Sequence, residues 1–203
     1  LLVQVLALLT IAPAGLLFGG IVSPRLQAWV AARPLLLQFA AAVAIADLFQ
    51  YAVHRAFHAV PWLWRFHAIH HSSRQMDWLA GSRLHLLDIV VTRGLSFVPL
   101  YVLGFAQGAV FAYVLFVSFQ AVLIHANVSW RFGALRWVLA TPQYHHWHHA
   151  VEPVDVNFAV HLPVIDRAFG TQYLPQDRWP AEYGMAGAPV PSGYWAQLVY
   201  PFR

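Results

Sequence analysis

Histidines in this chain are concentrated in short segments whose spacing suits metal ligands. His145, His148 and His149 stand at positions i, i+3 and i+4, so on a helix their imidazoles leave one face together. The same spacing recurs once upstream, and a further pair stands at i and i+4. The upstream segment contains His67, His70 and His71, and the pair is His54 and His58. Three separate segments therefore each present a histidine face.

Several imidazoles converge most readily when a metal ion lies between them, and imidazole binds iron, zinc, copper and nickel. With His125, the clustered histidines exceed the roughly four to six ligands that one ion takes, and they are enough for two ions. A closed structural zinc site needs only about four ligands. A dinuclear centre with open positions, in contrast, can bind and activate O₂.

Composition indicates that these segments belong to a membrane protein. The chain of 203 residues is 60% hydrophobic and only 10% charged, which is outside the usual range for soluble proteins. All 12 basic residues are arginines, and they are scattered, so we do not expect nucleic-acid binding. The absence of cysteine excludes an iron–sulfur cluster, thiolate haem ligation, a cysteine nucleophile and disulfides.

Apolar stretches long enough to cross a bilayer predict about four membrane-spanning helices in one domain, residues 1–203. Position 1 opens an apolar run with no basic segment before it, which predicts a span and not a signal peptide. Pro24, Arg25, Arg33 and Pro34 mark a short polar turn after the first span. The expected spans are 1–22, 35–53, 89–103 and 109–124; a histidine-rich cap covers 54–88 and 125–170, and an irregular tail covers 171–203.

This topology places all the clustered histidines on one side of the membrane. Most arginines share that side, so the positive-inside rule predicts a cytoplasmic cap. The arginines expected on the histidine side are Arg55, Arg65, Arg74, Arg83, Arg131, Arg136 and Arg167, against Arg25 and Arg33 on the other. The predicted fold class is therefore an all-α integral membrane protein with a cytosolic, helical, histidine-rich cap.

The histidine segments resemble the fatty acid hydroxylase and sterol desaturase superfamily of membrane-bound di-iron oxygenases. The resemblance covers about residues 47–171. Segments 54–58, 67–71 and 145–149 look like the three histidine boxes of the family, and 82–85, 125–127, 155–158 and 166–171 also fit its pattern.

The resemblance implies a four-span helical bundle, two iron ions, O₂ as oxidant, and hydroxylation or desaturation of a lipid C–H bond. The lipid is a sterol, fatty acyl lipid, alkylglycerol or carotenoid. Electrons must come from a separate reductase, ferredoxin or small cytochrome, because the chain has no cluster ligands, dinucleotide motif or P-loop. Zinc is a possible substitute for iron in a purified sample.

The sequence departs from the family at Ala121, where some members carry a further histidine, and His85 is the candidate to complete the ligand set. His146 and His161 are left out of the metal list. No catalytic residue is expected beyond the ligands. The predicted metal ligands are His54, His58, His67, His70, His71, His85, His125, His145, His148 and His149.

Polar side chains near the boxes are expected to orient histidines or to hold the cap, because a ligating imidazole is usually fixed through its other nitrogen. A carboxylate at membrane depth costs about 2.5–3.5 kcal/mol on insertion, so Asp47 should face protein and have a partner. The other candidates are Asp88, Asn127, Asp155, Asn157 and Asp166.

Two other functions remain as alternatives. A membrane zinc hydrolase should carry a glutamate base within a histidine pair, but Glu152 and Glu182 are both outside the histidine pairs. A non-enzymatic haem carrier would use two histidines from opposed spans and would leave most of the cluster without a role. Metal content and the presence or absence of a haem absorption band separate the three functions.

Overall fold

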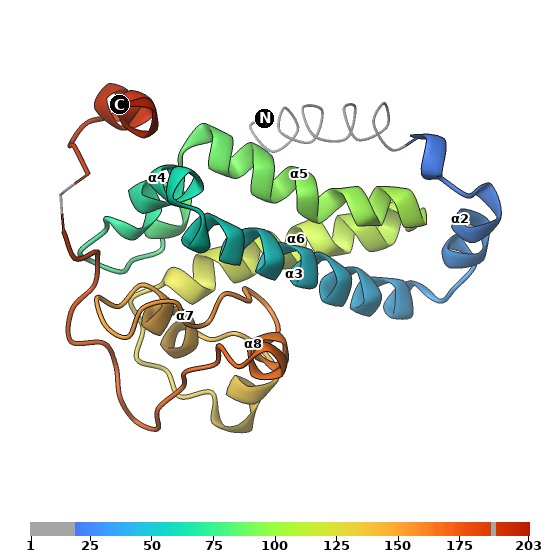
Figure 1. Cartoon of the computed structure of the whole chain (residues 1–203). Coiled ribbons are helices and arrows are strands. Elements are labelled where there is room, and N and C mark those ends of the chain that lie inside the picture. Colours follow the sequence, from blue (N-terminus) through green and yellow to red (C-terminus); the bar gives the residue numbers. More distant parts are fainter. Residues whose placement is uncertain (1–18, 188–189) are drawn as a thin grey trace.

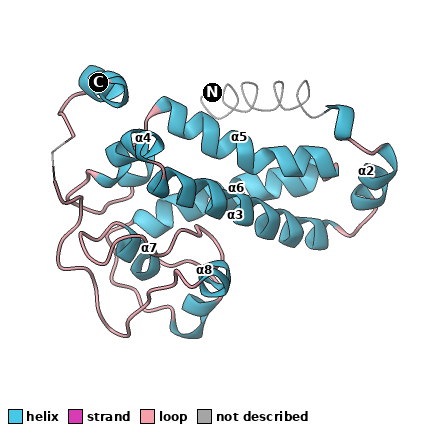
Figure 2. Ribbon diagram, in the orientation of Figure 1, coloured by secondary structure: helices cyan, strands magenta, loops and turns pink. Residues whose placement is uncertain are grey.

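The computed structural model describes residues 19–187 and 190–203, and within these residues every regular element is a helix (Figure 2). The predicted all-helical class is confirmed. The elements are η1 (Gly19–Ile21), α2 (Pro24–Ala31), α3 (Leu35–Ala59), α4 (Pro61–His71), η2 (Ala80–Ser82), α5 (Leu86–Leu103), α6 (Gln107–His125), η3 (Gly133–Trp137), α7 (Pro142–His148), α8 (Pro163–Phe169), α9 (Tyr194–Val199) and η4 (Tyr200–Phe202).

Three helices, α3, α5 and α6, are long and apolar enough to cross a membrane, with mean hydropathies of 1.6, 1.7 and 1.9. They lie side by side and form the body of the molecule (Figure 1). They correspond to the three later spans expected from the sequence, although α3 continues past residue 53 to Ala59 and carries His54 and His58 with it. Most of the expected first span, residues 1–22, is outside the described part of the chain.

Small side chains allow these helices to approach closely. Ala42 and Ala46 on α3 are fully buried, and they pack with Leu100 of α5 and with Tyr113 and Val117 of α6. Tight contact of this kind holds helices together where lipid gives no hydrophobic driving force. The outer face of α6 is apolar and exposed, with Phe111, Leu115, Phe119 and Val122 in one stripe, as expected for a face in contact with lipid tails.

The segment before α3 is a helix, α2, and not the polar turn expected from the sequence. Ser23 caps this helix through its hydroxyl, which accepts a hydrogen bond from the backbone of Leu26, and Pro24 occupies the first turn, where no donor is lost. Gln27 then donates to the carbonyl oxygens of Tyr101 and Val102 at 3.0 and 3.3 Å, which ties α2 to the end of α5.

The cap follows α6 and contains α7 and α8, with α4 at the same end of the long helices (Figure 1). Asp47, fully buried on α3, accepts hydrogen bonds from the backbone N–H groups of Val160, His161 and Leu162 at 2.6–3.2 Å. The expectation that Asp47 faces protein and has a partner is confirmed. This carboxylate joins the cap to a membrane-spanning helix.

A second buried carboxylate organises the cap internally. Asp166 accepts from the backbone N–H groups of Phe158 and Ala159 at 2.8 and 2.7 Å, from Thr171 Oγ1 at 2.6 Å, and from the hydroxyl of Tyr144. These contacts bind the loop after α7 to α8 and to α7 itself.

Within the described residues, the tail after residue 171 is mostly without regular structure, but it ends in α9 and η4. The α9 stretch has no proline of its own and lies between Pro191 and Pro201, which explains why a short helix forms there.

Candidate metal centre

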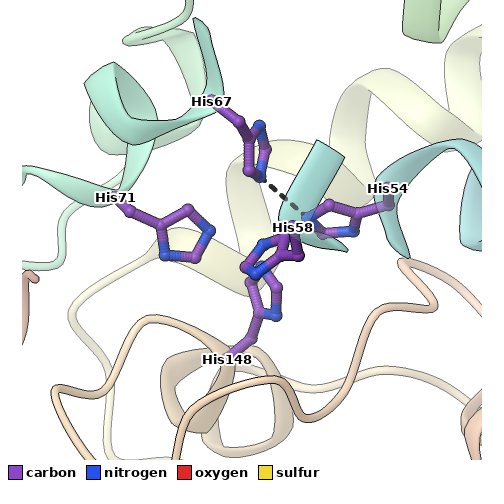
Figure 3. A group of neighbouring side chains, drawn as sticks. All are labelled: His54, His58, His67, His71 and His148. Atoms are coloured by element: carbon purple, nitrogen blue, oxygen red, sulfur yellow. Dashed lines mark hydrogen bonds between the residues drawn. The ribbon is translucent and has the colours of Figure 1, made fainter. Parts of the chain in front are cut away.

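Nine of the ten predicted ligands meet in two groups, and in each group one ligand nitrogen per residue lies within 4.8 Å of all the others. We call them the five-histidine group and the four-histidine group. The five-histidine group, shown in Figure 3, contains His54, His58, His67, His71 and His148, and the four-histidine group contains His70, His125, His145 and His149.

Two short helices contribute to both groups. On α4, His67 and His71 belong to the five-histidine group and His70 belongs to the four-histidine group. At the end of α7, His148 and His149 separate in the same way. Consecutive residues of a helix point about 100° apart, so neighbouring histidines diverge into adjacent groups. The groups remain in contact, because the rings of His71 and His149 stack with their centroids 4.5 Å apart.

Acceptors behind the rings determine which ring nitrogen carries the proton in the five-histidine group. Nδ1 of His54 lies 2.7 Å from the carbonyl oxygen of Phe158, and Nδ1 of His67 lies 2.7 Å from Oδ2 of Asp88. A carbonyl or carboxylate oxygen only accepts, so Nδ1 must donate, and Nε2 of a neutral ring then presents a lone pair. The same holds for Nδ1 of His148, 2.8 Å from a backbone carbonyl oxygen, and Nδ1 of His58, 3.2 Å from Asp155.

Backbone carbonyl oxygens fix the tautomer of histidines in the four-histidine group in the same way. Nδ1 of His125 lies 2.7 Å from the carbonyl oxygen of Ala121, and Nδ1 of His70 lies 3.2 Å from that of Arg83. Hydrogen bonding of this kind orients a ligating imidazole and raises its basicity toward a metal. Both rings therefore turn Nε2 toward the centre of the group.

Burial keeps the histidines on α4 and at the end of α7 in the neutral form that binds metal. It lowers the pKa of each well below the usual value of 6.5, and the surrounding imidazoles lower it further. The residues concerned are His67, His70, His71, His145, His148 and His149.

The arrangement of lone pairs fits a cation at the centre of each group. The Nε2 atoms of His54 and His67 are 3.0 Å apart, and neither carries a proton to share with the other. Nε2 of His145 lies 3.0 Å from Nε2 of His125 and 3.1 Å from that of His149. A buried polar atom without a partner costs about 1–3 kcal/mol. Within the described residues, Nε2 atoms of this kind are found at His58, His71 and His148 of the five-histidine group, and also at His146 outside both groups.

His85 is the one predicted ligand that the structure does not bring to either group. Its Nδ1 accepts a hydrogen bond from the backbone of Leu87 at 3.1 Å, and its Nε2 donates to the carbonyl oxygen of Leu198 at 3.0 Å. Both ring nitrogens are thus occupied in capping α5 and in joining it to the C-terminal helix. His146, which pairs with Tyr183 at 2.9 Å, and His161 also lie outside both groups.

The polar residues expected near the histidines divide into two kinds. Asp88 and Asp155 touch imidazoles of the five-histidine group. Asp47, Asn157 and Asp166 instead bind backbone and hold the cap loops. Asn127 is exposed and belongs to neither histidine group.

Sequence reasoning missed one residue that shapes the four-histidine group. A Cβ atom on Gly81 would lie 2.9 Å from Nδ1 of His125 and 3.0 Å from the carbonyl oxygen of Ala121. Only glycine leaves room for that hydrogen-bonded pair. The backbone carbonyl partners were also missed, because any residue type can supply them and no sequence signal marks them.

A cavity of about 80 Å³ connects the two groups with the membrane-spanning helices. Histidines of both groups line one end of it, among them His54, His67, His70, His125 and His145. Side chains of α3, α5 and α6 line most of the remainder, together with Gly81, Leu84, Val160 and His161. A molecule in this cavity therefore reaches both groups from within the bundle.

Residues 39–171 match the family described as fatty acid hydroxylase. The chain is 34% identical over 177 residues to the ornithine lipid hydroxylase OlsE of Rhizobium tropici, covering 86% of this chain and 53% of that protein. It is 31% identical over 134 residues to alkylglycerol monooxygenase of Xenopus tropicalis, covering 64% and 29%. A very-long-chain aldehyde decarbonylase, GL1-1 of Oryza sativa subsp. indica, is 33% identical over 140 residues, covering 64% and 22%.

The chain thus spans about half the length of the first of these relatives, at 53%, and less than a third of the other two. No solved structure matches it.

Proposed function

Because the chain belongs to the fatty acid hydroxylase family, we propose that it is a membrane-bound oxidoreductase that uses O₂ and a pair of iron ions to oxidise a C–H bond of a lipid. In hydroxylation, one oxygen atom enters the C–H bond and the other becomes water. Two electrons and two protons from an external reductant complete the balance. Desaturation of the same lipid is the alternative outcome.

The observation that carries this proposal is the pair of imidazole groups, with their lone pairs turned inward, at the end of a cavity among membrane-spanning helices. All the ligand candidates are neutral, so the bound metals would keep their full positive charge and act as strong electrophiles. When bound, two iron ions supply O₂ activation and the transfer of electrons to it.

The chain's own residues position the imidazoles and the lipid, and they exclude water from the site. The carbonyl and carboxylate partners of Nδ1 hold the imidazoles in one tautomer and one orientation. Side chains of both groups are buried, with exposures of 5% or less for His54, His67, His70 and His148. The cavity would hold the lipid so that one carbon faces the groups, which converts an encounter into a positioned reaction.

We further propose that the metal centre lies on the cytoplasmic side and receives electrons from a separate protein. The arginine distribution supports the first point, because the loops beside the histidines carry most of the positive charge. The absence of cysteine supports the second, because the chain has no ligand for a cluster of its own.

A zinc hydrolase is the weaker candidate. Both groups consist of histidine alone, and neither includes a carboxylate that would serve as the base for attack by water.

Metal analysis and lipid oxidation test the proposed function. We expect the purified chain to bind about two irons without a haem absorption band, consistent with two separate ligand groups. His148→Ala and His70→Ala each remove a ligand from one group, so we expect both to abolish oxidation of membrane lipids, measured by mass spectrometry with an electron donor present. Membrane insertion should be unaffected.

His146→Ala is the matched control, because His146 is buried on the same helix as His148 and lies outside both groups. We expect it to retain its metal. Oxidation at the wild-type rate by His148→Ala or His70→Ala would refute the proposal, as would one zinc per chain with hydrolysis of lipid esters.

A further inference from the structure

The cavity beside the histidines has a polar end inside the membrane-spanning bundle. Lining residues there include Gln50 on α3, Arg93 and Ser96 on α5, Tyr113 on α6, and His161 from the cap. Polar and ionisable side chains within membrane spans are costly and generally mark a functional site. The metal ligands do not explain these residues, because none of the five belongs to either histidine group.

Arg93 is a cationic side chain among those that line the cavity. Within the described residues, its guanidinium forms no ion pair with a carboxylate. Asp88 also lines the cavity: its Oδ2 atom is held by Nδ1 of His67 at 2.7 Å, and its Oδ1 atom is buried without a hydrogen-bond partner but forms no ion pair with Arg93. A guanidinium carries five N–H donors and no acceptor. The cavity therefore contains a cationic donor group that forms no ion pair with a carboxylate of the described residues.

Backbone hydrogen bonds fix the position of His161 at the polar end of the cavity. Asp47 holds its backbone N–H, and the backbone N–H of Ala140 donates to its carbonyl oxygen at 2.8 Å. These bonds press the ring against Tyr113 and Phe116, with centroids 6.1 and 5.2 Å away. The side chain is 1% exposed, and Nδ1 has no hydrogen-bond partner among the described residues. Burial, together with the positive charge of Arg93, lowers the pKa of His161 to about 3, so the ring is neutral.

Among the residues that line the cavity, Oδ1 of Asp88 is a free buried acceptor, and the groups able to donate outnumber it. Ser96 already satisfies Oε1 of Gln50, at 2.8 Å. The guanidinium of Arg93, the hydroxyl of Tyr113 and the imidazole of His161 remain as groups able to donate. A ligand group that only accepts, such as a carbonyl or carboxylate oxygen, matches this set better than a hydroxyl, which must also donate.

We propose that Arg93, Tyr113 and His161 form a subsite that binds the carbonyl or carboxylate oxygen of an acyl lipid. This inference rests on the proposed function and narrows its substrate to acyl lipids. The cavity volume of about 80 Å³ admits the acyl linkage and adjoining methylenes. Such a contact would fix how far along the chain the oxidised carbon lies.

The rise of the helices gives an estimate of the distance between the acyl oxygen and the carbon that faces the histidines. Gln50 precedes His54 by four residues on α3, and Arg93 follows Asp88 by five residues on α5. At 1.5 Å per residue these separations are about 6 and 7.5 Å along the helix axes. The subsite therefore places the carbon that faces the histidines within a few bonds of the acyl oxygen, not at the distal end of the chain.

Binding of simple acyl probes tests the subsite without requiring turnover. Radiolabelled palmitate is bound to the purified full chain in detergent micelles, with methyl palmitate and hexadecane as unlabelled competitors. These probes have the same chain length and carry a carboxylate, a neutral carbonyl, or no acceptor. We expect methyl palmitate to compete and hexadecane to compete at least about tenfold less well, because a hydrogen bond to a charged group is lost.

Variants then assign the binding to the proposed residues. Arg93→Gln and His161→Phe should each weaken palmitate and methyl palmitate about 10- to 100-fold and leave hexadecane unchanged. Arg25→Gln, an exposed arginine on α2, is the matched control and should bind like the wild type. Tyr113→Phe removes a single hydroxyl with little change of shape. If Arg93→Gln or His161→Phe fails to fold, this variant still tests the subsite.

Equal competition by hexadecane and methyl palmitate would overturn the proposal, as would unchanged probe binding in the three cavity variants. Palmitate binding that survives these variants but is lost in His148→Ala would show that the carboxylate binds at the metal centre, which also overturns it. Failure of the proposed function is distinguishable, since then the probes bind as predicted but no lipid is oxidised.

Discussion

The contact between Asp88 and His67 allows the role of the partners behind the ligands to be measured. Oδ2 of Asp88 lies 2.7 Å from Nδ1 of His67, and the two side chains are only 1% and 5% exposed. Asp88→Asn keeps the size of the side chain and an accepting oxygen but removes the negative charge. The five-histidine group contains a second pair of the same kind, between Asp155 and His58, in which the distance is 3.2 Å and the aspartate is 65% exposed.

The magnitudes follow from burial. A hydrogen bond to a charged group contributes about 1.5–3 kcal/mol and one between neutral groups about 0.5–1.5 kcal/mol, so loss of charge at the buried pair costs about 1–1.5 kcal/mol. This cost corresponds to roughly a tenfold loss of metal affinity. At the exposed pair solvent screens the charge, and we expect a loss of about twofold from Asp155→Asn. Asp155 has a φ of 57°, a conformation that asparagine also tolerates, so no strain is added.

The assay is competition between the purified chain and a chromophoric chelator for Zn²⁺, which reports affinity without turnover, followed by lipid oxidation in the iron-loaded protein. Thermal melts of the metal-free variants separate loss of metal binding from loss of folding. Equal effects of the two substitutions, a larger effect of Asp155→Asn, or unchanged affinity in Asp88→Asn would refute the reasoning that a buried carboxylate orients His67.

Three further predictions test other parts of the structure. Gly81→Ala places a methyl group 2.9 Å from Nδ1 of His125, so we expect loss of about one metal per chain by elemental analysis, from the four-histidine group alone. Tyr144→Phe removes a donor from the buried carboxylate of Asp166 and should lower the free energy of unfolding by about 1–3 kcal/mol in denaturant titrations; an unchanged midpoint would contradict it. Burial lowers the pKa of His146 from 6.5 to about 4, so below pH 6.5 the unfolded chain binds more protons than the folded chain. Thermal melts of the metal-free protein should therefore show stability falling between pH 6.5 and about 4, by up to about 1.4 kcal/mol per pH unit for each such histidine; a flat profile would contradict this.

The membrane-spanning helices could be predicted because their apolar runs are long and free of charge, and α5 and α6 lie where the runs indicated. The helix α2 was missed because its prolines and arginines resemble a turn. Pro24 and Arg25 follow the capping residue Ser23 in the first turn of α2, and Arg33 and Pro34 follow the end of the helix. At these positions prolines and arginines are compatible with a helix.

The residue types of the candidate site could be predicted from the sequence, but the division of its histidines into two groups could not. Helical spacing shows that His70 and His71 leave α4 in different directions, yet which group each joins depends on where α7 packs. His85 has the residue type of a ligand and lies near Asp88 in sequence, but it faces the C-terminal segment, which is distant along the chain. Contacts of such long sequence separation leave no trace in local patterns.

The sharing of α4 and α7 between the groups has a mechanical consequence. Adjacent residues on one turn, such as His148 and His149, enter different groups, so the interval between the two centres is built into the rigid geometry of the turn. A rotation or slide of α7 would displace ligands of both groups at once. A displacement of this short helix would therefore alter both metal positions together, whereas a displacement of His125 on α6 would alter only one.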